Sequence, residues 1–324
     1  MLLRKIRNLV EKWLRSRPSP AFSLSKNGIS PTIGIPRTLV YYLHPLLWET
    51  FFQECGFEVV VSKNTGPQVL QKASLISEAE HCLPVKLLDG HVDELAEKAD
   101  LVFIPRILSV RPAHIACPKL GALPDAVKAD FGDRIEVLTL EIDERRRSLQ
   151  ESLHELGRRL GVDTETVRAA ADKAREAMQE NLDTLADRTE TGSGKDFLLL
   201  SHPYNLQTSY LVDPIVKKLE SLGGHVEYVD FRRKPGSDGP VKWDMCSIMH
   251  EVLCELDQRD CAGVIQLTSF NCGCDSIVGN MFRDLLRQKK IPLMTLILDE
   301  HTAQAGVDTR LEAFVDSIKH ADGG

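Results

Sequence analysis

Apolar and polar positions along the chain follow two periods that alternate with each other. Short runs of β-branched and other apolar residues are separated by longer stretches in which apolar residues recur every three or four positions. This alternation is typical of parallel α/β architecture. The expected strands are 32–36, 58–62, 101–105, 135–141, 196–201, 225–230, 262–268 and 291–298.

These strands fall into two sets with similar spacing, which indicates an internal repeat. The segments "IGIPRTLVYYLHPLLWETFFQECGFEVVVS" and "LLLSHPYNLQTSYLVDPIVKKLESLGGHVEYVD" both run from a strand through a proline-bearing loop and a helix to a glycine and a second strand. We therefore expect two similar Rossmann/flavodoxin-like parallel-sheet domains, at 31–142 and 195–320, that face each other across a cleft. Ligands of such sheets bind at the carboxyl ends of the strands.

The segment between the two domains, 143–194, has helical periodicity and no strand signal. It is expected to be a helical connector of two helices broken near Gly161, with Asp163 or Thr164 as the N-cap of the second.

The N-terminal segment 1–20 is basic and carries its apolar residues on one helical stripe, which predicts an amphipathic helix rather than a signal peptide or a membrane span. Such a helix either packs on its own domain or docks to a partner or an anionic membrane surface. Residues 21–30 are expected to be a linker.

Composition limits the classes of function. The chain has 324 residues, 43% hydrophobic and 27% charged, with a formal net charge of −7, which describes a soluble globular protein and argues against broad nucleic-acid binding. A membrane protein is not expected. Eight cysteines without a secretory signal indicate a reducing, cytoplasmic setting, where thiols are core filler, metal ligands or catalysts.

On sequence grounds, four of the cysteines are weak candidates for metal binding or catalysis. Cys55, Cys254 and Cys261 lie in or beside apolar helices, so we expect them to be small buried hydrophobes. Cys246 opens the predicted helix before the third strand of the second half, as Cys82 does in the first half, and is the weakest candidate for a ligand.

Cys82, Cys117 and Cys272 differ because each is expected at a loop or a helix start. Proline follows the first two, in "CLP" and "CP", and fixes the shape of a ligand loop, whereas Gly273 lets the backbone approach a bulky group. Helix starts also favour thiolates. These features indicate a metal–thiolate site, although the intervals match neither a ferredoxin nor a zinc ribbon, so buried structural thiols stay an alternative.

Cys274 is ambiguous. In an extended loop residues i and i+2 point the same way, so Cys272 and Cys274 would reach one metal centre together. If a helix has already begun at Cys272, the two side chains diverge. His114, three residues before Cys117, would suit a zinc site.

Other familiar motifs are incomplete. "GSGKD" at 192–196 lacks the first glycine and the hydroxyl residue of a phosphate loop, and it precedes a strand, so ATP hydrolysis by this chain is not expected. "HEVLC" lacks the second histidine of a zinc protease, and no G-x-G-x-x-G follows the first strand, which disfavours a dinucleotide oxidoreductase.

Six segments in order, "IGIPRTLVYY", "EHCLPVKLLDGHV", "VFIPRILS", "CPKLGALPD", "SFNCGCDS" and "LDEHTAQAGVDTRLEAF", resemble the acyl-CoA dehydratase activase-related family, a domain of unknown function. This family is related to 2-hydroxyacyl-CoA dehydratase subunits and double-cubane cluster proteins. The resemblance covers about residues 31 to 320 and implies an oxygen-sensitive [4Fe-4S] cluster between two α/β domains, in an anaerobic setting.

The resemblance also implies site residues. The family's cysteines correspond to Cys82, Cys117 and Cys272, and the same motifs contain, without assigned roles, Glu80, Lys86, His91, Arg106 and Asp275. Relatives often have C-G-P-D where this chain has C-G-C-D. Cys274 therefore either supplies a fourth thiolate or leaves one iron open for a non-protein ligand.

In the related systems a separate ATP-hydrolysing activase passes a low-potential electron to the cluster protein. The resemblance thus implies low-potential electron transfer or reductive chemistry, with an activase or other electron donor as partner and a dehydratase-like partner subunit or a homodimer. Two other hypotheses stay open from the residues: a non-catalytic zinc–thiolate or scaffold subunit, and a pair of domains that bind a small molecule in their cleft without metal.

Overall fold

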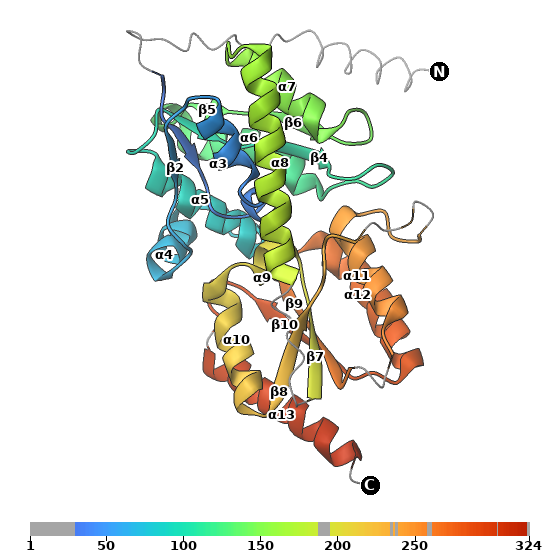
Figure 1. The fold of residues 1–324 in the computed structure, drawn as a ribbon. Coiled ribbons are helices and arrows are strands. Elements are labelled where there is room, and N and C mark those ends of the chain that lie inside the picture. The colour runs from blue at the N-terminus through green and yellow to red at the C-terminus, as the bar shows by residue number, and fades with distance from the viewer. Residues whose placement is uncertain are drawn as a thin grey trace, which may run out of the picture.

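The computed structural model describes residues 30–186, 195–233, 236, 239–257, 261–302 and 304–322 of the chain. The amphipathic helix expected at 1–20 and the linker expected at 21–30 lie outside the described residues, except for Ser30. Figure 1 shows the first half of the chain, blue to green, above the second half, yellow to red.

The first half contains a parallel sheet in the order β2-β1-β3-β5. Its strands are β1 (Ile33–Ile35), β2 (Val59–Val61), β3 (Leu101–Phe103) and β5 (Val137–Leu138). The helices of this half are α2 (Val40–Leu43), α3 (Leu47–Glu54), α4 (Pro67–Ile76), α5 (Leu83–Leu95) and α6 (Pro118–Phe131), followed by the 3₁₀ turn η1 (Gly132–Arg134).

The second half repeats this topology. Its strands are β7 (Lys195–Leu200), β8 (Gly224–Tyr228), β9 (Gly263–Ser269) and β10 (Leu293–Leu298), all parallel, in the order β8-β7-β9-β10. Counted within each half, both sheets place the second strand beside the first, then the third and fourth. The helices are α9 (Pro203–Leu206), α10 (Ser209–Ser221), α11 (Asp244–Glu255), α12 (Gly273–Lys289) and α13 (Gln304–Asp322). The expected α/β class with two parallel sheets is confirmed.

The sequence did not predict a small two-stranded parallel sheet in the first half. It pairs β4 (Arg106–Ser109) with β6 (Glu141–Asp143). The backbone N–H groups of Val102, Ile104 and Arg106 donate in turn to the carbonyls of Glu136, Leu138 and Leu140, so the pairing continues from one sheet to the other. The expected strand 135–141 forms β5 of the four-stranded sheet and the start of β6 of the small one.

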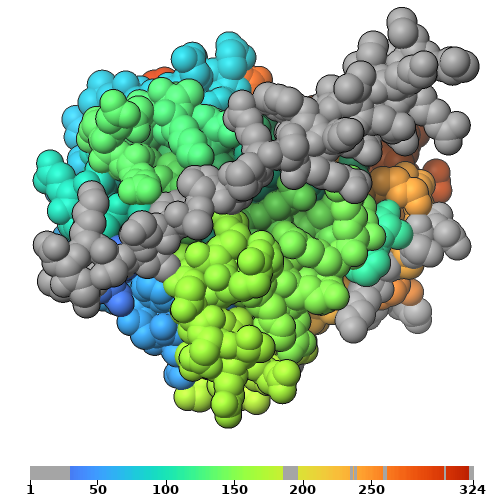
Figure 2. Space-filling view, turned by 90° about the horizontal axis from the view of Figure 1, so that it is seen from above, coloured from blue at the N-terminus to red at the C-terminus, as the bar shows by residue number. Residues whose placement is uncertain are grey.

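The helical connector forms where the sequence places it. It consists of α7 (Leu149–Arg159) and α8 (Thr164–Ala186). Ser148 and Glu151 form a capping box at the start of α7, Gly161 takes a left-handed φ of 71°, and the Asp163 carboxylate accepts hydrogen bonds from the first N–H groups of α8. Helix α8 packs along α3, and the two lie side by side on the surface seen from above (Figure 2).

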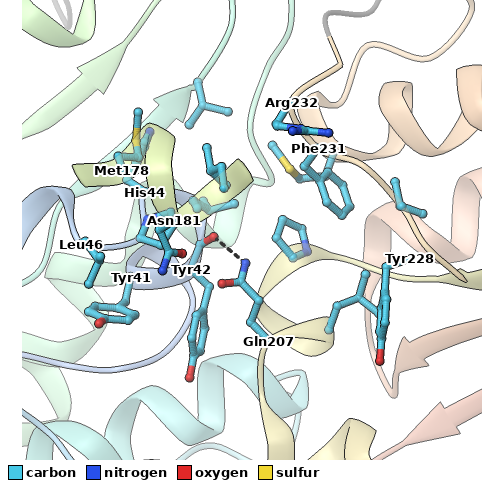
Figure 3. A pocket seen from close by; sticks show the side chains of 18 of the residues that line it. Tyr41, Tyr42, His44, Leu46, Met178, Asn181, Gln207, Tyr228, Phe231 and Arg232 are labelled. Atoms are coloured by element: carbon cyan, nitrogen blue, oxygen red, sulfur yellow. Dashed lines mark hydrogen bonds between the residues drawn. The ribbon is translucent and has the colours of Figure 1, made fainter. Parts of the chain in front are cut away.

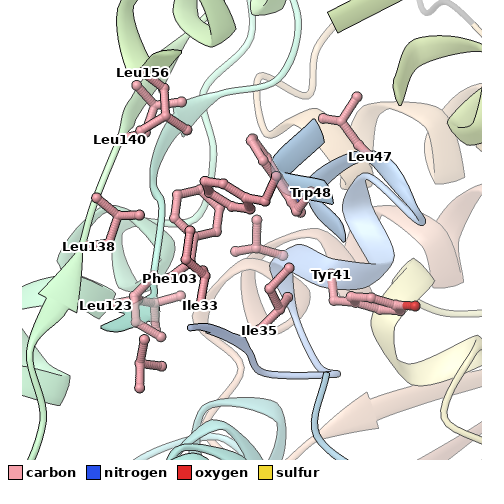
Figure 4. Close-up of a cluster of buried hydrophobic side chains, with 14 of the residues drawn as sticks. Ile33, Ile35, Tyr41, Leu47, Trp48, Phe103, Leu123, Leu138, Leu140 and Leu156 are labelled. Carbon is pink, nitrogen blue, oxygen red and sulfur yellow. The ribbon is translucent and has the colours of Figure 1, made fainter. Parts of the chain in front are cut away.

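Most core residues of each half pack within that half, but Val69, Leu83 and Leu87 of the first half belong to an apolar cluster of the second. In the first half, Trp48 and Phe52 pack against Phe103 of β3 with ring centroids 4.9 and 5.0 Å apart, at the centre of a large apolar cluster (Figure 4). In the second half, one cluster joins the sheet to α10 and α13, and another joins it to α11 and α12. Because both faces are covered, the sheet is rigid and chemistry is left to the loops at the strand ends.

Candidate metal centre

Three of the predicted ligands occupy the same local position, the N-cap of a helix. Cys82 precedes α5, Cys117 precedes α6 and Cys272 precedes α12, and none of the three side chains caps its own helix by a hydrogen bond. A helix start presents backbone N–H groups without partners and the positive end of the helix dipole, which together stabilise negative charge. Each thiol therefore stands beside a site suited to a thiolate.

Side chains join the three cysteine loops across the two halves. Lys119, two residues after Cys117, donates through Nζ to the carbonyl oxygens of Glu80, 3.4 Å away, and Asn271, 3.5 Å away. The Asn271 side-chain amide in turn donates to the Glu80 carboxylate at 3.0 Å. Glu80 precedes Cys82 and Asn271 precedes Cys272, so loops nearly 200 residues apart in sequence meet at one place.

The thiols are close enough to influence one another. The Cys274 thiol donates a hydrogen bond to Cys117 and lowers the pKa of Cys117 to about 6, while the same contact raises the pKa of Cys274. Burial raises the pKa of Cys82 to about 11, opposed by the nearby Lys119 ammonium and reinforced by Cys272 and Cys117. The structure thus brings together all four cysteines that the sequence singles out.

Helix α12 begins at Gly273, directly after Cys272, so the two neighbouring thiols lie in different environments. Cys272 is partly exposed, whereas Cys274 lies in the first turn of α12 and is buried in the core against α11. Cys272 itself keeps extended backbone angles, so the structure meets the condition of neither expectation fully: the helix begins only after Cys272, and the two thiols differ in burial. Cys274 nevertheless contacts Cys117 from the buried side.

A second group of metal-binding side chains lies beside these thiols. The ligand atoms of His202, Cys246 and Asp275 lie within 4.8 Å of one another, and all three residues are buried. His202 precedes α9, while Cys246 and Asp275 lie in the first turns of α11 and α12. One nitrogen, one sulfur and one carboxylate oxygen form a group that could hold a metal ion.

Hydrogen bonds fix the orientation of this group. His202 Nε2 and Asp275 Oδ1 are 2.9 Å apart, and the Thr268 hydroxyl donates to Asp275 Oδ2 at 2.6 Å. Burial alone would lower the pKa of His202, but the Asp275 carboxylate raises it well above the usual range. Both side chains also contact the Cys272 thiol, so this group is continuous with the three N-cap cysteines.

Sequence reasoning missed His202 and left Cys246 and Asp275 as weak or unassigned residues. The one signal available for His202 is its place after the first strand of the second half, before Pro203, where a loop residue of a parallel sheet faces a ligand. His114 does not belong to the group of His202 among the described residues; its Nδ1 lies 3.2 Å from the Pro112 carbonyl.

The space available differs on the two sides of the thiols. A cavity of about 20 Å³ is lined by Cys117, Cys246, Cys274 and His202, among others, and it has room for about one water molecule. This cavity is too small for a polynuclear cluster. Cys82, Cys117 and Cys272 are partly exposed.

The other residues of the resembling motifs have structural partners. Lys86 forms a buried ion pair with Glu300, which links α5 to the loop after β10. His91 lies between the hydroxyls of Ser62 and Thr65, at 2.9 and 3.0 Å. Arg106 pairs with Asp125 at 2.7 Å.

The cysteines set aside on sequence grounds are partly as expected. Cys261 is buried and Cys55 is partly buried against the core of the first half. The expectation for Cys254 is wrong, because this residue faces solvent near the end of α11. It lies on the outer side of an amphipathic helix whose other face carries the core residues.

The sequence matches one known protein family. The family model described as the CoA enzyme activase uncharacterised domain matches residues 32–231, more than half of the chain. The chain belongs to this family. The match to the CoA enzyme activase uncharacterised domain agrees with the resemblance over the first four of the six sequence segments, whereas "SFNCGCDS" and "LDEHTAQAGVDTRLEAF" lie beyond residue 231. No protein of curated function matches the sequence.

Solved structures similar to this family member have low identity. The SBP FpvC from Pseudomonas aeruginosa in complex with Mn²⁺ is 13% identical, with 90% of this chain and 99% of that chain covered, at a TM-score of 0.28. The AdcAII protein of Streptococcus pneumoniae is 11% identical, with 90% and 99% covered, at 0.28. A mutant of the laminin-binding adhesin of Streptococcus agalactiae is 11% identical, with 89% and 99% covered, at 0.25. Scores this low carry no argument about function.

Within the described part of the chain, no helix combines the length and apolar character needed to cross a bilayer.

Proposed function

We propose that this protein holds a [4Fe-4S] cluster between its two halves, with Cys82, Cys117 and Cys272 as three ligands and with the last iron either bound by Cys274 or left open for a non-protein ligand. The observation that carries the proposal is the position of three thiols at three helix N-termini, drawn from both halves and joined through Lys119. In this role the protein is a subunit for low-potential electron transfer or reductive chemistry, served by a separate ATP-hydrolysing activase or another electron donor.

The electrostatics support a negatively charged thiolate cluster. Three helix starts and the Lys119 ammonium place positive potential beside the thiols, and this offsets in part the burial that raises the pKa of Cys82. When bound, a cluster of this kind accepts and returns single electrons. The chain's own residues orient one ligand, since His202 and Asp275 contact Cys272. Cys274 lies against Cys117 on the buried side.

The surface beside Cys272 supports a protein partner. Phe270, Ile277 and Met281 are 53, 64 and 37% exposed, and the last two lie one turn apart on α12. Exposed apolar side chains gathered beside a functional site are typical of an interaction surface. An electron donor docked there would be close to the cluster ligands.

The test of the cluster is anaerobic purification followed by reconstitution with iron and sulfide. We expect brown protein with broad absorption near ~400 nm and about four iron and four sulfide per chain, as thiolate ligation of this cluster requires. Cys82→Ser and Cys117→Ser should each lose most of the iron, whereas Cys254→Ser, at the exposed thiol outside the site, should keep it. Colourless protein that takes up no iron would refute the proposal.

A zinc site is the second candidate, and one observation favours it. The His202, Cys246 and Asp275 donors are buried together, and a mixed nitrogen, sulfur and oxygen set suits tetrahedral zinc. In that case the protein is a non-catalytic zinc-binding or scaffold subunit. About one zinc per chain, lost in Cys246→Ser but retained in Cys82→Ser, together with no redox activity, would favour this role over the cluster.

A further inference from the structure

A cleft lined by residues of both halves has a volume of about 640 Å³. The loop after β1 and the end of α8 form one wall, and α9, the start of α10 and the loop after β8 form the other (Figure 3). The cleft thus opens at the carboxyl ends of β1 and β8, where parallel sheets bind ligands. Its volume is within the range of small-molecule sites.

Aromatic and aliphatic side chains form much of the lining. Tyr41, Tyr42, Tyr228 and Phe231 border the cleft from both halves, and Met178 borders it from α8 (Figure 3). Gln207 donates to the Tyr42 carbonyl at 3.2 Å and joins the two walls. Flat aromatic surfaces of this kind suit an apolar or aromatic body of a ligand.

Two buried polar atoms of this lining have no partner among the described residues. One is Nδ1 of His44, a residue that is only 5% exposed, and the other is Nη1 of Arg111. The second terminal nitrogen of Arg111 donates to the Phe231 carbonyl at 2.9 Å, which holds the guanidinium in place while Nη1 stays buried without a partner. Buried polar groups in native proteins are nearly always paired, so two such atoms in one cleft point to a polar ligand.

The other charges of the lining are less available. Arg232 already binds Asp230 and Asp183, at 3.0 and 2.9 Å. Glu144 lies near Arg111, but burial raises its pKa to about 7, so its negative charge neutralises Arg111 only in part at neutral pH. Asp244, which accepts a hydrogen bond from the Val110 N–H, is the carboxylate that acts most strongly on Arg111.

The loop after β1 also carries backbone strain. Leu39 and Leu46 have positive φ values of 44° and 61°, a region that a leucine rarely adopts, and Leu46 lines the cleft. Strain of this kind is concentrated at functional sites, where the surrounding structure holds a loop in one shape.

We propose that this cleft binds a small organic anion, with its anionic group on Arg111, a polar atom on His44, and an apolar or aromatic body against Tyr41, Tyr42 and Phe231. The site goes beyond the metal centre and does not depend on it. Leu43, Val110 and Met245 line both this cleft and the small cavity at the thiols, so one layer of side chains separates the two.

The test uses three probes with one body and different polar groups: 1-naphthyl phosphate, 1-naphthoate and 1-naphthol. Isothermal titration of the full chain should show one site per chain that binds at least one of the anions about tenfold or more tightly than 1-naphthol, because a charge-assisted hydrogen bond to Arg111 is lost with the neutral probe. The preferred anion distinguishes a phosphate ligand from a carboxylate ligand.

Arg111→Gln should reduce the affinity for the preferred anion to that of 1-naphthol, whereas Arg134→Gln, at an exposed arginine outside the cleft, should leave it unchanged. Anions that bind no more tightly than 1-naphthol, or an Arg111→Gln variant that binds them as before, would overturn the proposal. If Arg111→Gln fails to fold, Leu182→Trp, which fills the cleft from α8, must abolish binding, and retained binding there is equally fatal.

Discussion

Lys119 Nζ donates to the backbone carbonyl of Asn271, 3.5 Å away, and so connects the helix start behind Cys117 to the loop before Cys272. The same ammonium reaches the Glu80 carbonyl, in the loop before Cys82. One side chain therefore joins all three N-cap cysteine loops and places a positive charge beside the thiols. Substitution of Lys119 can therefore be measured in two ways, by its effect on stability and by its effect on the metal centre.

We expect Lys119→Gln to lower the free energy of unfolding by no more than about 1 kcal/mol, because partly exposed charged contacts contribute little. The reduction potential of the reconstituted cluster should become more negative, since a positive charge beside it is lost. Protein-film voltammetry and urea unfolding measure the two quantities. Lys128→Gln, at an exposed lysine of the same helix, is the control and should change neither. An unaltered potential in Lys119→Gln would show that this lysine acts only as a structural link.

Asp275 orients His202 and contacts Cys272. The variant Asp275→Asn therefore tests whether this carboxylate holds the metal ligands in place. Residues that hold metal ligands in place typically change affinity by about 10- to 100-fold when substituted. We expect a loss of that size in competition with a chelator, whether the bound metal is iron or zinc. Asp284→Asn, at an exposed aspartate on the same helix, should bind metal like the unmodified chain. Equal affinities in the two variants would contradict a supporting role.

The ion pair between Lys86 and Glu300 joins the two halves in a buried environment, with the Lys86 side chain 6% exposed. Glu300→Gln leaves the ammonium buried without its counter-charge, and we expect a loss of about 2–3 kcal/mol in urea unfolding. Adding Lys86→Met to that variant should recover part of the loss, because the uncompensated charge is removed. Glu155→Gln breaks an exposed pair with Arg158 and should cost less than about 1 kcal/mol. A double variant less stable than Glu300→Gln would contradict this account.

The buried His91 should make the free energy of unfolding depend on pH. Burial lowers its pKa from 6.5 to about 4, so the folded protein keeps the ring neutral while the unfolded chain protonates it below 6.5. The unfolding free energy that depends on the neutral His91 ring is therefore fully present above pH 6.5 and is lost as the pH falls towards 4. At pH 5 the loss amounts to about 2 kcal/mol. The difference in unfolding free energy between the unmodified chain and His91→Asn should therefore shrink between pH 7 and 5. His320→Asn, at an exposed histidine, should show a constant difference.

Gly157 allows α7 to approach α8 closely. A Cβ atom there would lie 2.3 Å from Cγ2 of Val167, and a β-branched side chain has little freedom to move aside. We expect Gly157→Ala to cost about 1–3 kcal/mol in thermal or urea unfolding. Gly279 of α12 has no atom within 4 Å of such a Cβ, so Gly279→Ala should stabilise the protein by up to about 1 kcal/mol. The same sign in both variants would contradict the packing argument.

The periodicity of the sequence was sufficient to locate the sheets and the helical connector. β-branched runs marked the strands of both halves, and Asp163 marked the start of α8, because these signals act over a few residues. The division of one expected strand into β5 and β6 was missed. It depends on the pairing of β6 with β4 in a separate small sheet, and pairing between strands is not a local property.

In the candidate site, too, local features could be predicted from the sequence and contacts between distant segments could not. Cysteines followed by proline or glycine at helix starts could be recognised from the sequence, since the chemistry of an N-cap is local. Whether they serve as cluster ligands stays a prediction. His202 could not be found in this way, because its importance comes from contact with Asp275, in a helix that follows a different strand.

The sequence by itself determined the α/β class, the repeat of two parallel sheets and the thiols at helix starts, since each depends on residues that are neighbours along the chain. Only the tertiary structure decided that these thiols meet, that Cys274 approaches Cys117 from the buried side, and that His202, Cys246 and Asp275 lie together. The physical reason is that the carboxyl ends of the strands from both halves face one another, and the packing of the halves sets which side chains share that space.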